Sequence, residues 1–562
     1  MQKQWWHDKV GYQIWPKSFQ DSNGDGIGDL PGVLSRLDYL QQLGVDLLWL
    51  SPVYVSPLAD QGYDIADYYG IDPRFGTMED MDRLLAETKR RGMHLLMDLV
   101  VNHCSDEHPW FQQAVADPTG PYADFFYFRR GKNGGAPCNW RGYFGQSVWS
   151  LVPGQTDLYY LHLFHQKQPD LNWQNPALRR EICKMVNWWL DKGLAGFRID
   201  AIVNIGKPDE FRDLPADRAD GLADCRRMLQ DPTAQARLYE YLAELRREAF
   251  APHSAFTVGE VFDTTPRQLA AFIGPEGFFS SMFDFSATCW GKSDAGWYAA
   301  QQPAPADYRD CCFAAAKAAA GIGFMSNIIE NHDEPRGASH YLPAEYAADP
   351  QAQKALAAVS LLLPGIPFVY QGQELGMTNT AIARIEQVDD VNTLGEYQAA
   401  LHAGLPPAQA LERVAHYSRD NARTPMQWCA GPGAGFTTGT PWLAPNPRYP
   451  QVNAAAQAAQ PDSPLAFYKQ LIALRKAGPC KETLVWGDFE PLWQQNSALA
   501  AFLRRRAGQT LLVASNLSAR PQTVRLPAAP LALLLNSRPE AAPTAGGALT
   551  LAPWQAVVLE LA

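Results

Sequence analysis

Three carboxylates stand where apolar runs end along this chain. Asp200 closes the run GFRID, Glu260 closes FTVGE, and Asp333 closes the triplet NHD. Carboxyl groups at the C-terminal ends of parallel strands converge on one face of a barrel. Two converging carboxylates are the minimum equipment for breaking a glycosidic bond. The three positions therefore predict acid–base and nucleophilic chemistry on a sugar.

The arginine near the first acid supports different roles for Asp200 and Glu260. Arg198 lies two residues before Asp200 on the same run, so both side chains point to one face of a strand. A neighbouring guanidinium favours the ionised carboxylate, which a nucleophile needs. Glu260 would be the general acid, which needs a raised pKa and a place on the far side of the scissile oxygen.

Eight short apolar runs supply the strands that such a site requires. Helix-like stretches separate several of them, and strands alternating with helices predict a parallel (β/α)₈ barrel. The runs are residues 11–16, 47–52, 94–102, 196–201, 256–261, 278–285, 325–332 and 366–371.

Two excursions and a tail depart from this alternation. Residues 104–173 are rich in Gly, Pro and aromatics, which predicts a small inserted domain after the third strand. The barrel would thus comprise residues 1–103 and 174–480, with an irregular lid over 375–461. Short alternating runs within residues 481–562 predict a C-terminal antiparallel β-sandwich.

Composition limits the class of partner. The 562 residues carry a net charge of −11 without a long basic run, which argues against nucleic acid and anionic membranes. Nine scattered cysteines without CxxC spacing predict free thiols in a reducing compartment. The N-terminus has no apolar signal region, and the apolar stretch 355–370 is interrupted by Pro364 and Gly365. We expect a cytoplasmic protein, monomeric or weakly self-associating, acting on a small oligosaccharide without an organic cofactor.

Seven motifs, taken together, resemble the α-amylase superfamily of glycoside hydrolases (family 13), specifically its oligo-1,6-glucosidase and α-glucosidase branch. Any one of them is weak evidence, but their order along nearly the whole chain makes chance agreement very small. They are residues 12–21, 98–103, 168–172, 196–200, 259–261, 331–333 and 418–428.

The resemblance implies a role for each matching position. Asp200 would be the nucleophile, Glu260 the acid and then the base, and Asp333 the stabiliser of the oxocarbenium-like transition state. Asp60 and Arg423 would pair and close the pocket around one terminal glucose, which makes the enzyme exo-acting. The remaining sugar-site residues implied by the resemblance are Tyr63, His103, Phe144, Phe164, Arg198 and His332.

The loop DSNGDGIGD at residues 21–29 places oxygen ligands at alternating positions, which suits a hard cation such as Ca²⁺. It begins like an EF-hand loop, but Gly32 stands at position twelve where that loop has Glu. The resemblance implies a structural Ca²⁺ whose ligands are Asp21, Asn23, Asp25, the Ile27 carbonyl and Asp29.

Two departures leave the substrate open. In this branch, Val after the nucleophile accompanies α-1,6 substrates and Thr accompanies α-1,4 substrates, whereas this chain has Ala201. Glu334 follows the third acid where Gln or Asn is more usual, and could raise a carboxyl pKa or bind a substrate hydroxyl. An exo-α-glucosidase acting on isomaltose-like sugars is the first hypothesis, and a trehalose-6-phosphate hydrolase is the second.

Two further readings have less support. A sucrose isomerase would carry an Arg-Leu-Asp-Arg-Asp loop, which this sequence lacks. A non-catalytic relative, such as the heavy subunit of an amino-acid transporter, would carry a membrane anchor and eroded acids, whereas this chain keeps all three.

Overall fold

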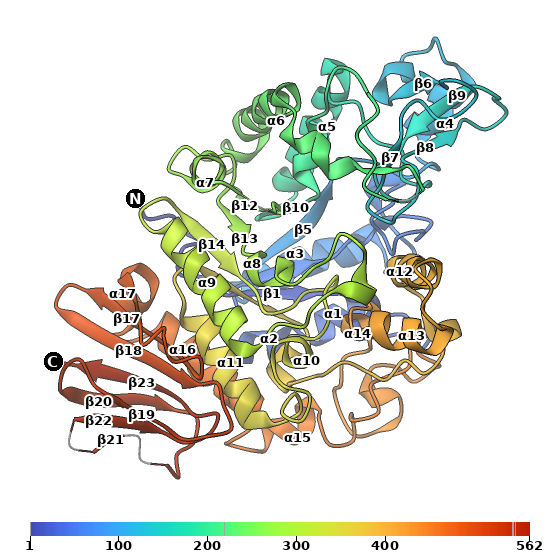
Figure 1. Ribbon diagram of the computed structural model, residues 1–562. Helices are drawn as coiled ribbons and strands as arrows, with labels where there is room; N and C mark the ends of the chain where they lie inside the picture. Colours follow the sequence, from blue (N-terminus) through green and yellow to red (C-terminus); the bar gives the residue numbers. More distant parts are fainter. Residues whose placement is uncertain (1, 219, 263, 542–543, 546) are drawn as a thin grey trace.

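The computed structural model describes residues 2–218, 220–262, 264–541, 544–545 and 547–562. Eight parallel strands form a closed barrel in the order β1-β15-β14-β13-β12-β10-β5-β2 (Figure 1). They are β1 (Gly11–Ile14), β2 (Leu47–Leu50), β5 (His94–Val100), β10 (Gly196–Asp200), β12 (Phe256–Gly259), β13 (Ser281–Phe283), β14 (Phe324–Asn327) and β15 (Ile366–Tyr370). All eight predicted strands are confirmed, as is the barrel.

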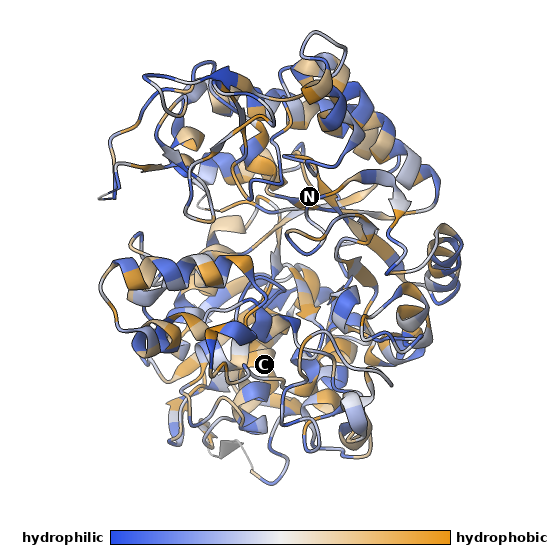
Figure 2. Ribbon diagram, turned by 90° about the vertical axis from the view of Figure 1, so that its right-hand side faces the viewer, coloured by the Kyte–Doolittle hydropathy of each residue, from blue (hydrophilic) through white to orange (hydrophobic). Residues whose placement is uncertain are grey.

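Alternation along the strands separates the inside of the barrel from its outside. On β2, Leu47 and Trp49 join an inner apolar cluster, whereas Leu48 and Leu50 join the larger cluster beneath the helices. Figure 2 shows apolar strands in the interior and helices in which apolar and polar residues alternate. The barrel is therefore a packed core, and polar residues on its inner face are exceptions that need a reason.

Helices connect successive strands and cover the barrel. The principal ones are α1 (Leu30–Ser35), α2 (Leu37–Leu43), α3 (Met78–Arg90), α5 (Pro176–Asp191), α6 (Pro232–Leu245), α7 (Pro266–Ile273), α8 (Ser286–Cys289), α9 (Pro305–Ala319), α10 (Gly337–Tyr341), α11 (Pro350–Leu362) and α16 (Pro464–Lys476). Many begin with a proline preceded by a capping side chain, as Asn175 caps α5 and Ser463 caps α16.

The inserted region is built from two stretches of chain. Between β5 and β10 lie α4 (Pro109–Ala116), β6 (Phe128–Arg130), β7 (Trp140–Arg141), β8 (Trp149–Leu151) and β9 (Leu158–Leu161). After β10, a second stretch supplies β11 (Ala223–Asp224), which pairs with β7, and its Cys225 and Met228 enter the core of the inserted region. This second contribution could not be predicted, because residues 206–230 have no clear periodicity.

The predicted lid is more regular than expected. It contains α12 (Val391–His402) and α13 (Pro407–Ala415), followed by the short helices α14 (Asp420–Arg423) and α15 (Ala454–Ala458). In Figure 1, α12 and α13 lie below the inserted region on the same side of the barrel. Asn392, Gly395 and Gly404 weaken the helical signal of this segment in the sequence.

The C-terminal unit is the antiparallel β-sandwich that the sequence predicts. After α17 (Lys481–Trp486), one sheet has the order β16-β17-β18-β23-β20 and the other β19-β22-β21. The strands are β16 (Asp488–Leu492), β17 (Leu499–Arg506), β18 (Gln509–Asn516), β19 (Gln522–Arg525), β20 (Pro530–Asn536), β21 (Thr544–Ala545), β22 (Ala548–Leu551) and β23 (Ala556–Leu561). β16, β21 and β22 are additional to the predicted strands.

Two global predictions can be compared with the structure. No disulfide joins the nine cysteines, all of which lie in the described part of the chain. Within the same part of the chain, none of the helices is both long enough and apolar enough to span a bilayer.

Candidate active site

Arg198 organises the acids at the C-terminal end of the barrel. Its Nη1 lies 2.7 Å from Oδ1 of Asp98 and 2.6 Å from Oδ1 of Asp200, while its Nη2 lies 3.0 Å from Oε1 of Glu260. The guanidinium is buried, and β5, β10 and β12 are adjacent in the barrel. One fixed cation therefore brings the predicted nucleophile and the predicted acid side by side.

Burial raises the pKa of Asp200 well above its usual range, and the charges of Glu260 and Asp98 act in the same direction, while Arg198 opposes them. Buried Asp200 thus retains a proton more readily than an isolated aspartate does. Two carboxyl groups held side by side by one guanidinium are what one nucleophile and one general acid require.

The backbone immediately after β10 holds the second acid. Ala201 has φ 45° in the left-handed region, and its N–H donates to Oε2 of Glu260 at 2.7 Å. A non-glycine residue in this region stores strain, which here aims an amide at the carboxylate. Glu260 is thus held by Ala201 through one oxygen and by Arg198 through the other.

The third acid belongs to a stacked aromatic assembly. Nε2 of His332 lies 2.9 Å from Oδ2 of Asp333 and 2.7 Å from the Tyr63 hydroxyl. The His332 ring is stacked with Trp15 and with Tyr63, with centroids 5.1 and 5.3 Å away. The side-chain amide of Gln13 lies 2.8 Å from Nδ1 of His332 and fixes the other edge of the ring.

A lid arginine, Arg419, pairs with Asp60. Nη2 of Arg419 lies 3.2 Å from Oδ1 of Asp60 and 2.7 Å from Oδ1 of Asp390, and Nη1 lies 3.3 Å from Oδ1 of Asp333. All four residues come from loops at one end of the barrel or from the lid. This network ties the lid to the loop after β2 beside the catalytic acids.

The predicted pairing of Asp60 with Arg423 is wrong. Nη2 of Arg423 lies 3.0 Å from Oδ1 of Asp333, and its Nε donates to the carbonyl of His332 at 3.0 Å. Arg419 and Arg423 are four residues apart around the short helix α14, so both face the same side. The sequence could not decide which of them reaches Asp60.

The lid arginines also control the charge of the third acid. Burial alone would favour a neutral carboxyl, yet His332 and the two lid arginines hold the pKa of Asp333 well below its usual range. Asp333 is therefore ionised at any working pH. A fixed negative charge at this position would stabilise an oxocarbenium-like transition state.

The remaining predicted sugar-site residues line the wall between the barrel and the inserted region. Nε2 of His103 lies 3.0 Å from the Tyr63 carbonyl, and burial lowers the pKa of this imidazole. The Phe164 ring lies 5.1 Å from the His103 ring and 6.0 Å from the Phe144 ring. The guanidinium of Arg419 lies 5.6 Å above the Phe144 ring. All the predicted residues of the sugar site thus belong to one connected region.

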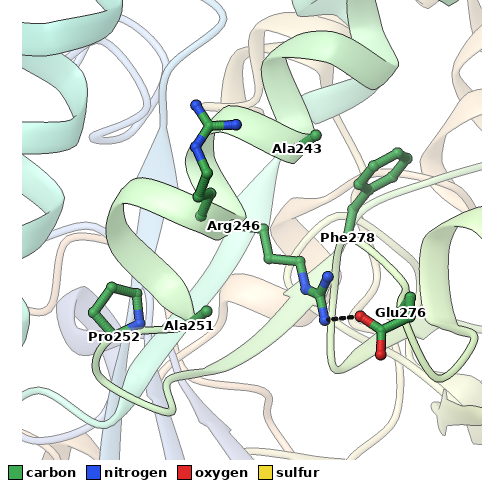
Figure 3. A pocket seen from close by; sticks show the side chains of 7 residues that line it. Ala243, Arg246, Ala251, Pro252, Glu276 and Phe278 are labelled. Carbon is green, nitrogen blue, oxygen red and sulfur yellow. Dashed lines mark hydrogen bonds and ion pairs between the residues drawn. The ribbon is translucent and has the colours of Figure 1, made fainter.

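A pocket of about 200 Å³ lies at the Asp60–Arg419 ion pair. It is lined by Asp60, Gln61, Asp389, Arg419 and Arg423, among others. A larger hollow of about 430 Å³ lies elsewhere, around the π-helical turn Arg246–Phe250, where Arg246 pairs with Glu276 (Figure 3). Ala251 and Pro252 of that hollow precede the start of β12, so it lies at the opposite end of the barrel from the catalytic acids.

The family model described as "Alpha amylase, catalytic domain" matches residues 13–487, and "Alpha-amylase SusG C-terminal domain" matches residues 499–558. The chain belongs to the α-amylase family. As a member of that family it is a glycoside hydrolase, and the family predicted from the motifs is confirmed.

Three similar proteins show the range of the family. An oligo-1,6-glucosidase from Parageobacillus thermoglucosidasius is 40% identical over 531 residues, covering 94% of this chain and 93% of that protein. A trehalose-6-phosphate hydrolase from Escherichia coli is 39% identical over 518 residues, covering 92% of this chain and 91% of that protein. The solved structure of trehalulose synthase MutB from Pseudomonas mesoacidophila MX-45 is 38% identical, covers 100% of both chains and has a TM-score of 0.93.

Sequence reasoning missed several residues of this α-amylase-family site. Asp98 anchors Arg198 and accepts from the indole N–H of Trp49 at 2.7 Å. The side-chain amide of Gln168 lies 3.2 Å from Asp60 and 3.2 Å from the Tyr63 carbonyl. Asp98, Gln168 and Arg419 all stand inside motifs that the sequence displays, so the motifs were the signal that could have found them.

The loop predicted to bind Ca²⁺ is held by hydrogen bonds of its own. The carboxylate of Asp21 accepts from the amides of Asn23, Gly24 and Gly26 at 2.9, 2.7 and 2.8 Å, and also from the Thr437 hydroxyl. Four donors use all the in-plane acceptor positions of one carboxylate. Among the residues that the structure describes, no three His, Cys, Asp or Glu side chains are grouped so as to hold a metal ion.

The other predicted ligands also stabilise turns in this loop. Asp25 accepts from the amide of Ile27 at 2.8 Å, and Asp29 caps α1 by accepting from the amide of Gly32 at 2.6 Å. The oxygen-rich chemistry suits a hard cation, but this arrangement does not form a ready metal site. A cation at Asp21 would have to replace at least one hydrogen bond, and Ca²⁺ binding stays a prediction.

Proposed function

We propose that this protein is a retaining, exo-acting α-glucosidase. It would release glucose from the non-reducing end of short α-glucosides, and its preferred substrates would be α-1,6-linked, such as isomaltose, isomaltooligosaccharides and panose. The observation that carries the exo assignment is the network of Asp60, Arg419 and Asp333. A site closed at one end by a buried ion pair has room for a terminal sugar but not for a chain that continues past it.

In the first step, Asp200 attacks the anomeric carbon while Glu260 gives its proton to the glycosidic oxygen. Arg198 contacts Asp200 at 2.6 Å and so favours its ionised, nucleophilic form. Glu260 is held in place by Arg198 at 3.0 Å and by the N–H of Ala201 at 2.7 Å. The glycosidic bond breaks as the bond to Asp200 forms, and the leaving sugar departs with the proton. A glucosyl ester with inverted configuration remains on Asp200.

In the second step, the ionised Glu260 removes a proton from water, and the water oxygen displaces Asp200 from the anomeric carbon. Two inversions return the sugar to its original α configuration. Asp333, ionised beside His332, faces the positive charge that develops on the ring in both steps. Tyr63 and His103 would position the glucose.

The family resemblance leaves two competing substrates. Trehalose-6-phosphate hydrolase is the alternative, because a relative of that name is nearly as similar as the oligo-1,6-glucosidase. The sucrose-isomerase reading has a structural neighbour in MutB, a trehalulose synthase, but the Arg-Leu-Asp-Arg-Asp loop is not found in this sequence.

The deciding experiment compares glucose release from isomaltose and from trehalose 6-phosphate, with Asp200→Asn as the inactive control. We expect a higher kcat/KM for isomaltose. A higher kcat/KM for trehalose 6-phosphate would replace the proposal with its alternative. Polarimetry on the isomaltose reaction should show α-glucose as the first product, and β-glucose would contradict the retaining mechanism.

A further inference from the structure

An ion pair beside the catalytic acids has no part in the mechanism above. Lys292 lies in the loop after α8, and Glu334 directly follows Asp333 in the loop after β14. Nζ of Lys292 lies 3.3 Å from Oε1 of Glu334. The Lys292 side chain is 46% exposed and that of Glu334 is 19% exposed, so the pair stands at the mouth of the site.

The position of the pair identifies the part of the substrate that it borders. Glu334 is close enough to the acids that, after burial itself, the charges of Asp333 and Glu260 help to raise its pKa, while Lys292 opposes them. The leaving sugar must lie on the side of Glu260, which protonates its oxygen. The opposite end is closed by Asp60 and Arg419. Lys292 and Glu334 therefore face the leaving group.

A second cation on this rim is also neutralised. Arg226 is near enough to Lys292 for its charge to act on the ammonium, but its guanidinium is bound by Asp224 through several contacts of 2.5–3.1 Å. Each of these two cations thus has its own acid. A phosphate on the leaving sugar carries a charge of about −1.5 to −2 at pH 7 and requires cations that are free to bind it.

We propose that Glu334 masks Lys292 and thereby selects uncharged leaving groups over phosphorylated ones. The ion pair offers hydroxyl groups of a neutral sugar both a donor and an acceptor. It also places a negative charge where a phosphate would otherwise meet Lys292. This inference rests on the proposed function and adds to it the residue that decides between the two substrate classes.

The test is the ratio of kcat/KM for trehalose 6-phosphate to kcat/KM for isomaltose, because any general damage to catalysis next to Asp333 cancels in the ratio. Glu334→Gln should raise this ratio about tenfold or more, since it removes a repulsive charge and frees Lys292. Glu334→Asp, which keeps the charge, should leave the ratio near the wild-type value. Combining Glu334→Gln with Lys292→Gln should remove most of the gain.

Ionic strength and a second variant test the masking role of Glu334 independently. The gain in Glu334→Gln should shrink as salt rises from about 0.05 to 0.5 M, because partly exposed charges are screened. Lys292→Gln alone keeps the repulsive Glu334 and should lower the ratio, which can be measured even if Glu334→Gln fails to fold. A partly exposed ion pair contributes little to stability, so both variants are expected to fold.

The two proposals fail in different ways. A wild-type enzyme that prefers trehalose 6-phosphate overturns the proposed function, whatever the variants do. A wild-type enzyme that prefers isomaltose, together with an unchanged ratio in Glu334→Gln or an increased ratio in Lys292→Gln, overturns the masking role and leaves the α-glucosidase assignment standing.

Discussion

The two ends of the active site are built differently. At the closed end, Asp60, Arg419 and Asp390 are all buried, and their charges are compensated by contacts of 3.2 Å or less. At the open end, Lys292 and Glu334 form one partly exposed pair at 3.3 Å. Removing one partner from a buried ion pair costs far more than removing one from an exposed pair.

In the proposed function, the two ends would meet different parts of the substrate. The closed end would recognise a terminal glucose, which is common to isomaltose and trehalose 6-phosphate. The open end meets the leaving group, which differs between them. We therefore expect substitutions at the closed end to lower kcat/KM for all substrates by a similar factor. Substitutions at the open end should change the ratio of kcat/KM between substrates.

The largest expected effect comes from the junction of the two ends. Asp200→Asn should lower kcat on isomaltose by about 10⁴ or more, because the amide cannot serve as the nucleophile. Arg198 keeps its contacts with Asp98 and Glu260, so the melting temperature should stay close to the wild-type value. Retention of even a tenth of wild-type activity would show that Asp200 is not the nucleophile.

The next effect is confined to the closed end. Asp60→Asn should lower kcat/KM about a hundredfold for isomaltose, because it removes one partner of a buried charge pair. The loss for any other substrate with a terminal α-glucose should be the same. Asp38→Asn is the matched control, since Asp38 pairs with Arg91 but is 73% exposed. A loss that differed strongly between substrates would contradict the separation of the two ends.

The pH dependence of activity distinguishes Asp333, which the lid arginines bind, from Asp200 at the junction of the two ends. Asp333 has a lowered pKa and stays ionised, whereas burial raises the pKa of Asp200, which must be ionised to attack. Activity should therefore fall with decreasing pH around an inflection above about 3.9, the ordinary value for an aspartate. Profiles of kcat/KM for isomaltose and for an aryl α-glucoside should share this acidic limb. An inflection at or below the ordinary aspartate value would assign the limb to another group.

Features that lie in one contiguous stretch of sequence could be predicted, whereas contacts between distant segments could not. The acids at positions 200, 260 and 333 stand in contiguous motifs, and all eight barrel strands lie in short runs rich in apolar residues, so both could be predicted. The contribution of Cys225 and Met228 to the inserted region was not, because it depends on the pairing of β11 with a distant strand. Such tertiary pairings leave little trace in a two-residue strand.

The choice of Arg423 as the partner of Asp60 failed for a different reason. Arg419 precedes and Arg423 ends the same short helix, and their reach depends on how the lid packs against the barrel. Arg419 lies between three carboxylates, and Arg423 bonds to the backbone of His332. A motif identifies residues that meet at a site, but it does not specify which atoms pair.

The smallest expected effect concerns the loop of residues 21–29, which touches the closed end through the lid. Asp21 bonds to Thr437, and the carbonyl of Gly26 accepts from the amide of Trp442 at 3.1 Å. If Ca²⁺ binds there, EDTA should lower the melting temperature by about 2–5 °C, and added Ca²⁺ should restore it. Asp25→Asn should reduce this response, and metal analysis of the purified protein should find about one Ca²⁺ per chain.

The same loop gives one more way to test the separation of the two ends. It supports the lid that carries Arg419. Loss of Ca²⁺ should therefore lower kcat/KM for isomaltose and for trehalose 6-phosphate by the same factor. A calcium-free protein with an unchanged melting temperature would mean that the hydrogen bonds of Asp21 suffice without a metal. A change in the ratio of the two substrates would instead mean that the lid also shapes the open end, where only Lys292 and Glu334 are expected to act.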